Sequence, residues 1–238
     1  MVEDRFHRLE LLVGTAGLEC LQNASVAVFG VGGVGSYAAE ALARGGIGRL
    51  TLIDFDQVCP SNINRQIHAL DPTVGRPKVE VMAERCRAIN PQLDVVPRHL
   101  TYRAETADEL LAESYDYVLD CIDTITAKLH LIQSCHQRRL PVISSMGAAN
   151  KLDPTLIRVA DLADTKKCRL ARTIRRELRK RGIERGVQVI YSTEEFRPLT
   201  GADATERKPL LGSSSYIPPL FGLTMAGVVI QRLIGDID

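Results

Sequence analysis

A glycine-rich segment between an apolar strand and an Ala-rich helix constrains the fold of this chain more than any other feature. Residues 26–29 predict a buried strand, the run Gly30-Val31-Gly32-Gly33-Val34-Gly35 follows it, and residues 36–44 predict a helix. A second strand at 50–53 ends on Asp54. A G-x-G-x-x-G loop in this context, with an acidic residue closing the next strand, is typical of a nucleotide-binding β–α–β unit.

The rest of the chain extends this pattern. Strands and helices alternate up to about residue 150, which predicts a mostly parallel sheet. The predicted fold class is therefore α/β, with a Rossmann-like central sheet flanked by helices and extended by further strands in the C-terminal part. The elements expected after the first unit are helices at 78–89, 124–138 and within 166–185, strands at 95–96, 117–120, 141–145, 157–159 and 187–191, a loop at 197–215 and an apolar core segment at 217–230.

The glycine loop predicts a phosphate site but does not identify the nucleotide. Glycines let the backbone turn sharply and approach phosphate oxygens, and the following helix offers free N–H groups. The carboxylate of Asp54 is placed to accept from ribose hydroxyls. NAD, FAD, S-adenosylmethionine and ATP sites all use versions of this loop. The loop residues expected to contact the nucleotide are Gly30, Gly32, Gly33 and Gly35.

A long polar excursion, residues 56–77, favours ATP. It contains Arg65 and leads to Lys78, and cations beside a phosphate loop stabilise the charge that develops in adenylyl transfer. Asp123 follows the strand at 117–120, where a carboxylate suits a Mg²⁺ ion that bridges phosphates. The residues of this region expected at the nucleotide are Asn62, Asn64, Arg65, Gln66, Lys78, Asp123 and Thr124.

Composition narrows the other possibilities. The chain is 45% hydrophobic and 25% charged, as in an ordinary soluble globular protein. Its six cysteines form no C-x-x-C pair, so no structural zinc is expected. Scattered cysteines of this kind are typical of reduced thiols in a cytoplasmic protein. The segment 217–230 is too short for a typical membrane span and contains Pro218 and Pro219, so no membrane anchor is expected.

Several motifs together resemble the ubiquitin-activating-enzyme-like superfamily of adenylating enzymes, which includes the ThiF, MoeB and HesA proteins. Besides the glycine loop, they are Asp54-Phe55-Asp56, Ser61-Asn62-Ile63-Asn64-Arg65-Gln66, Gly75-Arg76-Pro77-Lys78 and Asp120-Cys121-Ile122-Asp123. The resemblance implies one ThiF-type domain over 1–238, with a nucleotide-binding half (1–150) and a substrate-facing, dimer-supporting half (151–238). It also implies catalytic roles for Arg65, Lys78, Asp123 and Arg8, the last reaching across a homodimer into the partner's site.

One branch of the superfamily matches further stretches. The runs 62–70, 83–85, 90–91, 153–155, 161–163 and 191–194 resemble the tRNA threonylcarbamoyladenosine dehydratases. That resemblance implies adenylation of the threonyl carboxylate of a modified tRNA adenosine, followed by ring closure that expels AMP. The alternative left open is adenylation of the C-terminal glycine of a ubiquitin-like sulfur carrier, and a sulfur-transfer protein is a possible partner. A nucleotide-sensing scaffold is less favoured because it would not need the cations at the phosphates.

A basic segment favours tRNA. Residues 166–185 carry ten Lys or Arg and two Glu, a net charge of +8, although the whole chain carries only +1. Such a cluster neutralises nucleic-acid phosphates, whereas an isolated charged helix face is usually only solvated. Cys168 lies within it, and an inert thiol is expected there. The candidate tRNA-binding residues are Lys166, Lys167, Arg169, Arg172, Arg175, Arg176, Arg179 and Lys180.

Overall fold

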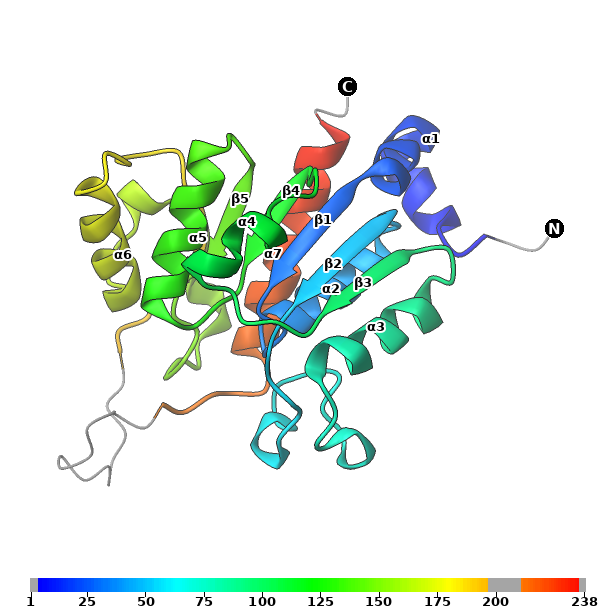
Figure 1. The fold of residues 1–238 in the computed structure, drawn as a ribbon, viewed down its shortest axis with the longest axis horizontal. Helices are drawn as coiled ribbons and strands as arrows, with labels where there is room; N and C mark the ends of the chain where they lie inside the picture. Colours follow the sequence, from blue (N-terminus) through cyan, green and yellow to red (C-terminus); the bar gives the residue numbers. More distant parts are fainter. Residues whose placement is uncertain (1–3, 197–210, 236–238) are drawn as a thin grey trace.

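A single seven-stranded sheet organises the computed structural model, which describes residues 4–196 and 211–235 (Figure 1). The strand order is β3-β2-β1-β4-β5-β7-β6, and only the β6–β7 pair is antiparallel. The predicted α/β class with a mostly parallel sheet is confirmed. The strands are β1 (Ser25–Phe29), β2 (Arg49–Ile53), β3 (Asp94–Arg98), β4 (Tyr117–Asp120), β5 (Val142–Ser145), β6 (Ile157–Asp161) and β7 (Gln188–Ser192).

Helices cover both faces of the sheet (Figure 1). One face carries α2 (Gly35–Arg44), α3 (Lys78–Ile89) and α7 (Ile217–Ile234), with α1 (His7–Asn23) packed on α7. The other face carries α4 (Ala107–Leu110), α5 (Ile125–Gln137) and α6 (Arg169–Arg179). Side chains alternate along β1 accordingly, since Val26 and Val28 join the first core and Ala27 and Phe29 join the second.

Two helices, α1 and the short α4, have no counterpart among the predicted elements. Helix α1 is interrupted at Gly14, whose φ of 71° is not helical, and it exposes Leu11 and Leu12 to solvent. A helix with this interruption and an apolar outer side lacks the clean 3.6-residue period by which a helix is recognised. The predicted loop at 197–215 falls mainly on residues 197–210, which lie outside the described part of the chain.

Helix α7 belongs to the core, as the apolar segment at 217–230 predicts. By length and composition it is the one described helix that could cross a membrane, but Phe221, Met225 and Val229 are fully buried within the protein. It lies so close to α2 that a Cβ on Gly222 would be 2.1 Å from the carbonyl oxygen of Val34. The C-terminal helix therefore supports the helix that follows the glycine loop.

The strand order reverses direction between β1 and β4. The chain continues from β1 to β2 on one side, and β4 lies on the other side of β1. At such a switch point the connections leave in opposite directions and open a crevice at the carboxyl ends of the strands. The glycine loop, Asp54 and Asp123 all follow the carboxyl ends of β1, β2 or β4, so the fold gathers them at one edge.

Candidate functional site

The glycine loop closes tightly between β1 and α2. Gly30 has a φ of 89°, and its N–H donates to the carbonyl oxygen of Ile53 at 2.8 Å. A Cβ on Gly30 would lie 2.8 Å from the carbonyl oxygen of Cys121, and one on Gly35 would lie 1.8 Å from that of Gly30. Neither position accepts a side chain, so no side chain from these two residues covers the loop backbone at the N-terminus of α2. The N–H groups at a helix N-terminus favour anions.

Asp54 ties the glycine loop to the end of β2. Its carboxylate accepts from the N–H of Val31 at 2.6 Å and from the N–H of Asp56 at 2.8 Å. Burial raises the pKa of Asp54 above its ordinary value, and the two N–H donors and Lys78 offset part of that rise. Each carboxylate oxygen can accept more than one hydrogen bond, so Asp54 retains capacity for a ribose hydroxyl.

The polar excursion folds back over the glycine loop. A Cβ on Gly33 would lie 3.3 Å from Cγ of Arg65 and 3.0 Å from Cβ of Pro218, so Gly33 is enclosed between the excursion and the start of α7. A Cβ on Gly32 would lie 3.8 Å from Nε2 of Gln66. The structure therefore brings Arg65 and Gln66 to the loop, although 30 or more positions separate them in the sequence.

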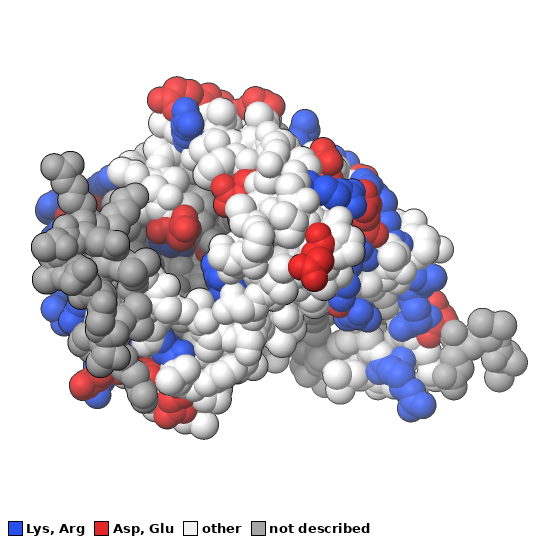
Figure 2. Space-filling model, turned by 90° about the horizontal axis from the view of Figure 1, so that it is seen from below, with Lys and Arg blue, Asp and Glu red and all other residues white. Residues whose placement is uncertain are grey.

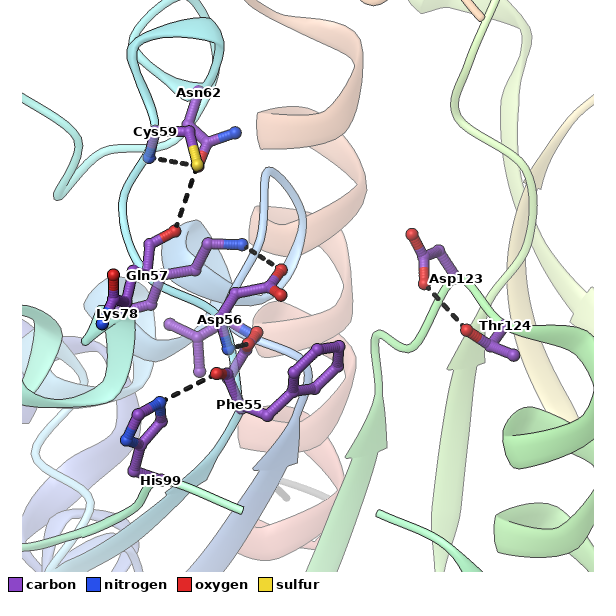
Figure 3. A network of polar contacts seen from close by, with 11 residues as sticks. Phe55, Asp56, Gln57, Cys59, Asn62, Lys78, His99, Asp123 and Thr124 are labelled. Atoms are coloured by element: carbon purple, nitrogen blue, oxygen red, sulfur yellow. Dashed lines mark hydrogen bonds and ion pairs between the residues drawn. The ribbon is translucent and has the colours of Figure 1, made fainter. Parts of the chain in front are cut away.

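Asn62 and Asn64 shape the turn that presents Arg65. The buried Asn62 accepts from the N–H of Cys59 at 3.0 Å (Figure 3), and its carbonyl oxygen accepts from the N–H groups of Arg65 and Gln66. The guanidinium of Arg65 donates to Oδ1 of Asn64 at 2.9 Å, and Asn64 donates to the carbonyl oxygen of Ser213 at 3.0 Å. Asn64 is exposed, and Arg65 is half-buried.

Lys78 occupies the start of α3 and faces Asp56. Its ammonium is almost completely buried and lies 2.6 Å from Oδ2 of Asp56, which is half exposed (Figure 3). Asp56 is not among the site residues predicted from the sequence. The signal that identifies it is an Asp-x-Asp at a strand end, beside the buried Lys78. The ammonium also acts on Asp54 electrostatically, so Lys78 belongs to the same site.

Asp123 lies across the crevice from these residues. Figure 3 shows Asp123 and Thr124 on the connection between β4 and α5, opposite Asp56 and Lys78. Asp123 is exposed, and its Oδ1 accepts from the hydroxyl of Thr124 at 3.3 Å. Two residues earlier, the carbonyl oxygen of Cys121 lies 2.8 Å from where a Cβ on Gly30 would stand, so the connection that carries Asp123 begins beside the glycine loop.

These groups fit an adenine nucleotide with a divalent cation. The bare loop and the helix N-terminus suit phosphates, with the guanidinium and ammonium alongside. Oε1 of Gln66 is buried and has no donor among the described residues, so a hydroxyl or amino group of a ligand would satisfy it. The exposed carboxylate of Asp123 is the kind of oxygen ligand with which proteins hold Mg²⁺ together with phosphates.

Arg8 lies apart from this crevice within its own chain. It is exposed near the start of α1, and α1 ends immediately before β1 at the amino edge of the sheet (Figure 1). The glycine loop follows the opposite, carboxyl end of β1. A role for Arg8 at a nucleotide therefore requires a second copy of the chain.

The basic segment forms α6 with a single apolar stripe, Ala171, Ile174 and Leu178. Of the candidate tRNA-binding residues, Arg175 is half buried and donates to Thr165 Oγ1 at 2.6 Å and to two backbone carbonyls. The remaining candidates are exposed: Lys166, Lys167, Arg169, Arg172, Arg176, Arg179 and Lys180. Seen from the carboxyl ends of the strands, Lys and Arg side chains lie on both the α6 side and the opposite side of a largely uncharged central area (Figure 2).

Cys168 is buried at the N-terminus of α6. Its Sγ accepts from the N–H of Ala171 at 3.5 Å, and its side chain packs in the core beneath the helix. This position matches the expected inert thiol. Among the described residues, no three His, Cys, Asp or Glu side chains are grouped as a metal site.

Comparison with known proteins identifies the family. Residues 6–238 match the ThiF family. The tRNA threonylcarbamoyladenosine dehydratase of Bacillus subtilis is 46% identical and covers 98% of this chain and 96% of its own length. The crystal structure of E. coli tRNA N6-threonylcarbamoyladenosine dehydratase, TcdA, in complex with ATP has a TM-score of 0.89 at 36% identity, and the match covers 98% of this chain and 97% of that chain.

A sulfur-carrier-type relative matches less of the chain. The molybdopterin-synthase adenylyltransferase of Escherichia coli is 37% identical, but the match covers only 63% of this chain and 59% of its own length. The alternative prediction, a sulfur-carrier adenylyltransferase, is therefore less favoured than a tRNA-modifying enzyme.

Proposed function

Because the chain belongs to the ThiF family, within its tRNA threonylcarbamoyladenosine dehydratase branch, we propose that it adenylates the carboxylate of threonylcarbamoyladenosine in tRNA with ATP and drives its cyclisation. The enclosure of Gly33 between Arg65 and Pro218 carries the proposal, because it brings the residue that bears the guanidinium, through its Cγ, against the phosphate loop. A dehydrogenase would need no cation at that point. Adenylyl transfer does, because negative charge grows on the transferred and departing phosphates.

The reaction has two steps. A carboxylate oxygen of the modified nucleoside forms a bond to the α-phosphorus of ATP, and the bond from that phosphorus to the bridging oxygen breaks, so pyrophosphate leaves. A nucleophilic atom of the same modification then attacks the activated carbonyl carbon, and AMP leaves with the former carboxylate oxygen. The net change in the nucleoside is the loss of one water.

The residues divide this work. The N–H groups of the glycine loop bind phosphate, Asp54 holds the ribose, and Arg65, Asn64 and Lys78 bind the phosphates on which charge develops. Gln66 and Asn62 line the same loop. Asp123, with Thr124 beside it, would hold Mg²⁺, which neutralises phosphate charge when bound.

The mutual geometry supports these roles. Lys78 is already charge-paired with Asp56, so in this state its ammonium is oriented and desolvated before any phosphate arrives. Arg65 is held by Asn64 and by the carbonyl oxygen of Ser61 at 2.8 Å. A preorganised cation loses little entropy on meeting the transition state.

Exposed residues on α1 and α6 support the proposed partners. A homodimer in which Arg8 enters the partner's site is supported by the exposure of Arg8 and of Leu11 and Leu12, which are 69% and 75% exposed one turn further along α1. Neighbouring exposed leucines are typical of a protein interface. The exposed cations of α6 would bind tRNA phosphates. We place the enzyme in the cytoplasm, with a sulfur-transfer protein as a further possible partner. We assign residues 1–150 to nucleotide binding, and residues 151–238 to substrate binding and to support of the dimer.

The direct test uses ATP, Mg²⁺ and total tRNA. AMP should form only when the tRNA carries threonylcarbamoyladenosine, and the mass of that nucleoside should fall by one water. The matched control is tRNA that lacks the modification. Pyrophosphate exchange with a ubiquitin-like carrier protein, without AMP release in the presence of tRNA, would instead establish the sulfur-carrier activity.

A further inference from the structure

A buried charged network lies behind Asp123. Nζ of Lys128, on α5, donates to Oδ2 of Asp120 at 2.8 Å and to Oγ of Ser144 at 3.2 Å. Oγ of Ser144 donates to the same Oδ2 at 2.6 Å. The side chains of Lys128 and Asp120 are 0% exposed, so the pair has no contact with solvent.

The network joins the two ends of the connection that carries Asp123. Asp120 is the last residue of β4 and lies in register between Phe29 of β1 and Ser144 of β5. Lys128 is in the first turns of α5, and its own N–H donates to the carbonyl oxygen of Thr124 at 3.0 Å. Residues 121–124 therefore span between two points that the Lys128–Asp120 ion pair clamps together.

The second oxygen of Asp120 acts on the connection itself. Oδ1 accepts from the N–H of Ile122 at 3.1 Å, which fixes the Cys121–Ile122 peptide, one peptide before the one that joins Asp123. On the other side, the N–H of Cys121 donates to the carbonyl oxygen of Phe29 at 2.8 Å. The backbone that carries Asp123 is therefore fixed by contacts with β1, β5 and α5.

Stability alone does not account for this arrangement. Desolvating two charges costs several kcal/mol, and apolar residues of similar volume are often as stable or more so. A buried lysine on an otherwise apolar helix face needs a reason, because Leu129 and Ile132 on the same helix pack into the core in the ordinary way. Groups that orient metal ligands from behind are commonly charged and hydrogen-bonded.

We infer that Lys128, Asp120 and Ser144 are positioning residues that aim the Asp123 carboxylate at the divalent cation on the nucleotide phosphates. The inference rests on the proposed function, because it takes Asp123 as the metal-binding residue. None of the three touches substrate. They act by holding the β4–α5 connection in one geometry.

The test separates metal binding from nucleotide binding. Mn²⁺ serves as a spectroscopic probe for Mg²⁺, and its affinity is measured by electron paramagnetic resonance in the presence of a non-hydrolysable ATP analogue. The affinity for the analogue without metal is measured by calorimetry. The main variant combines Asp120→Asn with Lys128→Met, which removes both charges and so leaves no unpaired one. Ser144→Ala is the milder variant, and it keeps the inference testable if the double variant does not fold.

The double variant should weaken Mn²⁺ binding by about 10- to 100-fold, the usual effect of losing groups that support metal ligands. Its affinity for the metal-free analogue should match that of the unaltered protein. Ser144→Ala should shift Mn²⁺ binding in the same direction by a smaller factor. A matched control, Glu40→Gln with Arg85→Met, removes another ion pair with a buried carboxylate, between α2 and α3, and should leave Mn²⁺ binding unchanged.

Asp123→Ala is the reference. If it abolishes Mn²⁺ binding while the folded double variant and Ser144→Ala bind Mn²⁺ normally, the inference is wrong and the proposed function stands. If Asp123→Ala itself binds Mn²⁺ normally, Asp123 is not the metal-binding residue, and both the metal assignment and this inference fall. If the control pair weakens Mn²⁺ binding equally, the effect is a general loss of stability and the inference is also overturned.

Discussion

His68 is the residue whose burial has the largest consequence for stability against pH. It is 2% exposed, follows Arg65 and Gln66 in the polar excursion, and neither ring nitrogen has a partner among the described residues. Burial, together with the positive charges of Lys78 and Arg85, lowers the pKa of His68 to about 4. The ring is therefore neutral in the folded protein at physiological pH.

This shift predicts acid sensitivity with a definite sign. The folded pKa of about 4 lies below the unfolded value of 6.5, so the unfolded chain binds the additional proton and stability is lost as pH falls from about 6.5 toward 4. Between about pH 7.5 and about pH 5, the free energy of unfolding should fall by about 2 kcal/mol more in the unaltered protein than in His68→Met. Urea unfolding at both pH values measures this. His136→Met, at an exposed position, should show no such difference from the unaltered protein.

Arg65 is the residue whose loss should affect chemistry without affecting the fold. Arg65 is half-buried on the excursion, and its Cγ packs against Gly33. Arg65→Ala should reduce AMP formation by about 10²- to 10³-fold, as is usual when one transition-state donor is removed. Thermal unfolding should stay unchanged. Arg158→Ala, which removes an exposed arginine bound to nearby carbonyls on β6, is the control and should retain activity. Equal activity of the two variants would show that Arg65 is not at the reacting phosphates.

Sequence reasoning can single out candidate residues that lie in local motifs. The glycine loop, Asp54, Arg65 and Lys78 are visible because their spacing around strand ends is itself the signal. Lys128 is not visible in this way, because its partners Asp120 and Ser144 lie on two other elements and only the register of β4 and β5 brings them together. Pro218 at Gly33 is a contact of the same kind, between the two halves of the chain.

Among the elements, α2 and α7 approach each other closely at a glycine. Gly222 lets the two helices approach until a Cβ would lie 2.1 Å from the carbonyl oxygen of Val34, whereas a Cβ on Gly227 of the same helix would meet nothing within 4 Å. Backbone atoms cannot move aside as side chains do. The two glycines are therefore a matched pair within one helix.

The pair gives opposite expectations for the same substitution. Gly222→Ala should lower the free energy of unfolding by at least about 3 kcal/mol, because overpacking against backbone forces the helices apart. Gly227→Ala should raise it by about 1 kcal/mol, the ordinary gain in helix propensity. Urea unfolding of both variants measures the contrast. A similar loss of stability in both would mean that Gly222 is not at a close helix contact.

Helix α6 should determine affinity for tRNA. Arg172→Glu combined with Arg179→Glu reverses two exposed cations on α6 and should weaken tRNA binding by at least about tenfold. The slope of log affinity against log salt should become shallower by about 2, one for each lost phosphate contact. The matched control reverses Arg87 and Arg103, which are exposed near β3 at the other edge of the sheet. Equal losses in the two double variants would indicate a general charge effect and no site on α6.

Elements were predictable where periodicity is clean. Helix α3 begins and ends at the predicted residues, and β4 does too. Helix α1 was not predictable, because Gly14 breaks its period and its exposed leucines obscure which side faces the core. The order of β5, β7 and β6 was not predictable either, because an antiparallel edge strand is chosen by tertiary packing and not by local sequence.

At the scale of the whole molecule, the proposed homodimer makes a quantitative prediction. If Arg8 acts in the partner's site, Arg8→Ala and Arg65→Ala should each be inactive alone, yet mixing and reassembling them should restore about a quarter of full activity. Half of the reassembled dimers are mixed, and each mixed dimer has one intact site, as two-fold symmetry requires. AMP release before and after subunit exchange measures this. No recovery, with exchange verified by mass spectrometry, would exclude a role for Arg8 across the dimer.

The contact between Gly33 and Pro218 also has a consequence for how the protein is made. Roughly 180 residues separate the two positions, so the phosphate loop takes its final shape only through a contact of very long sequence separation, the kind that forms late in folding. On the ribosome, the first β–α–β unit emerges long before α7 can pack against α2. We therefore expect nascent chains to gain nucleotide binding only after α7 has left the exit tunnel, so that ATP binding reports the completion of folding.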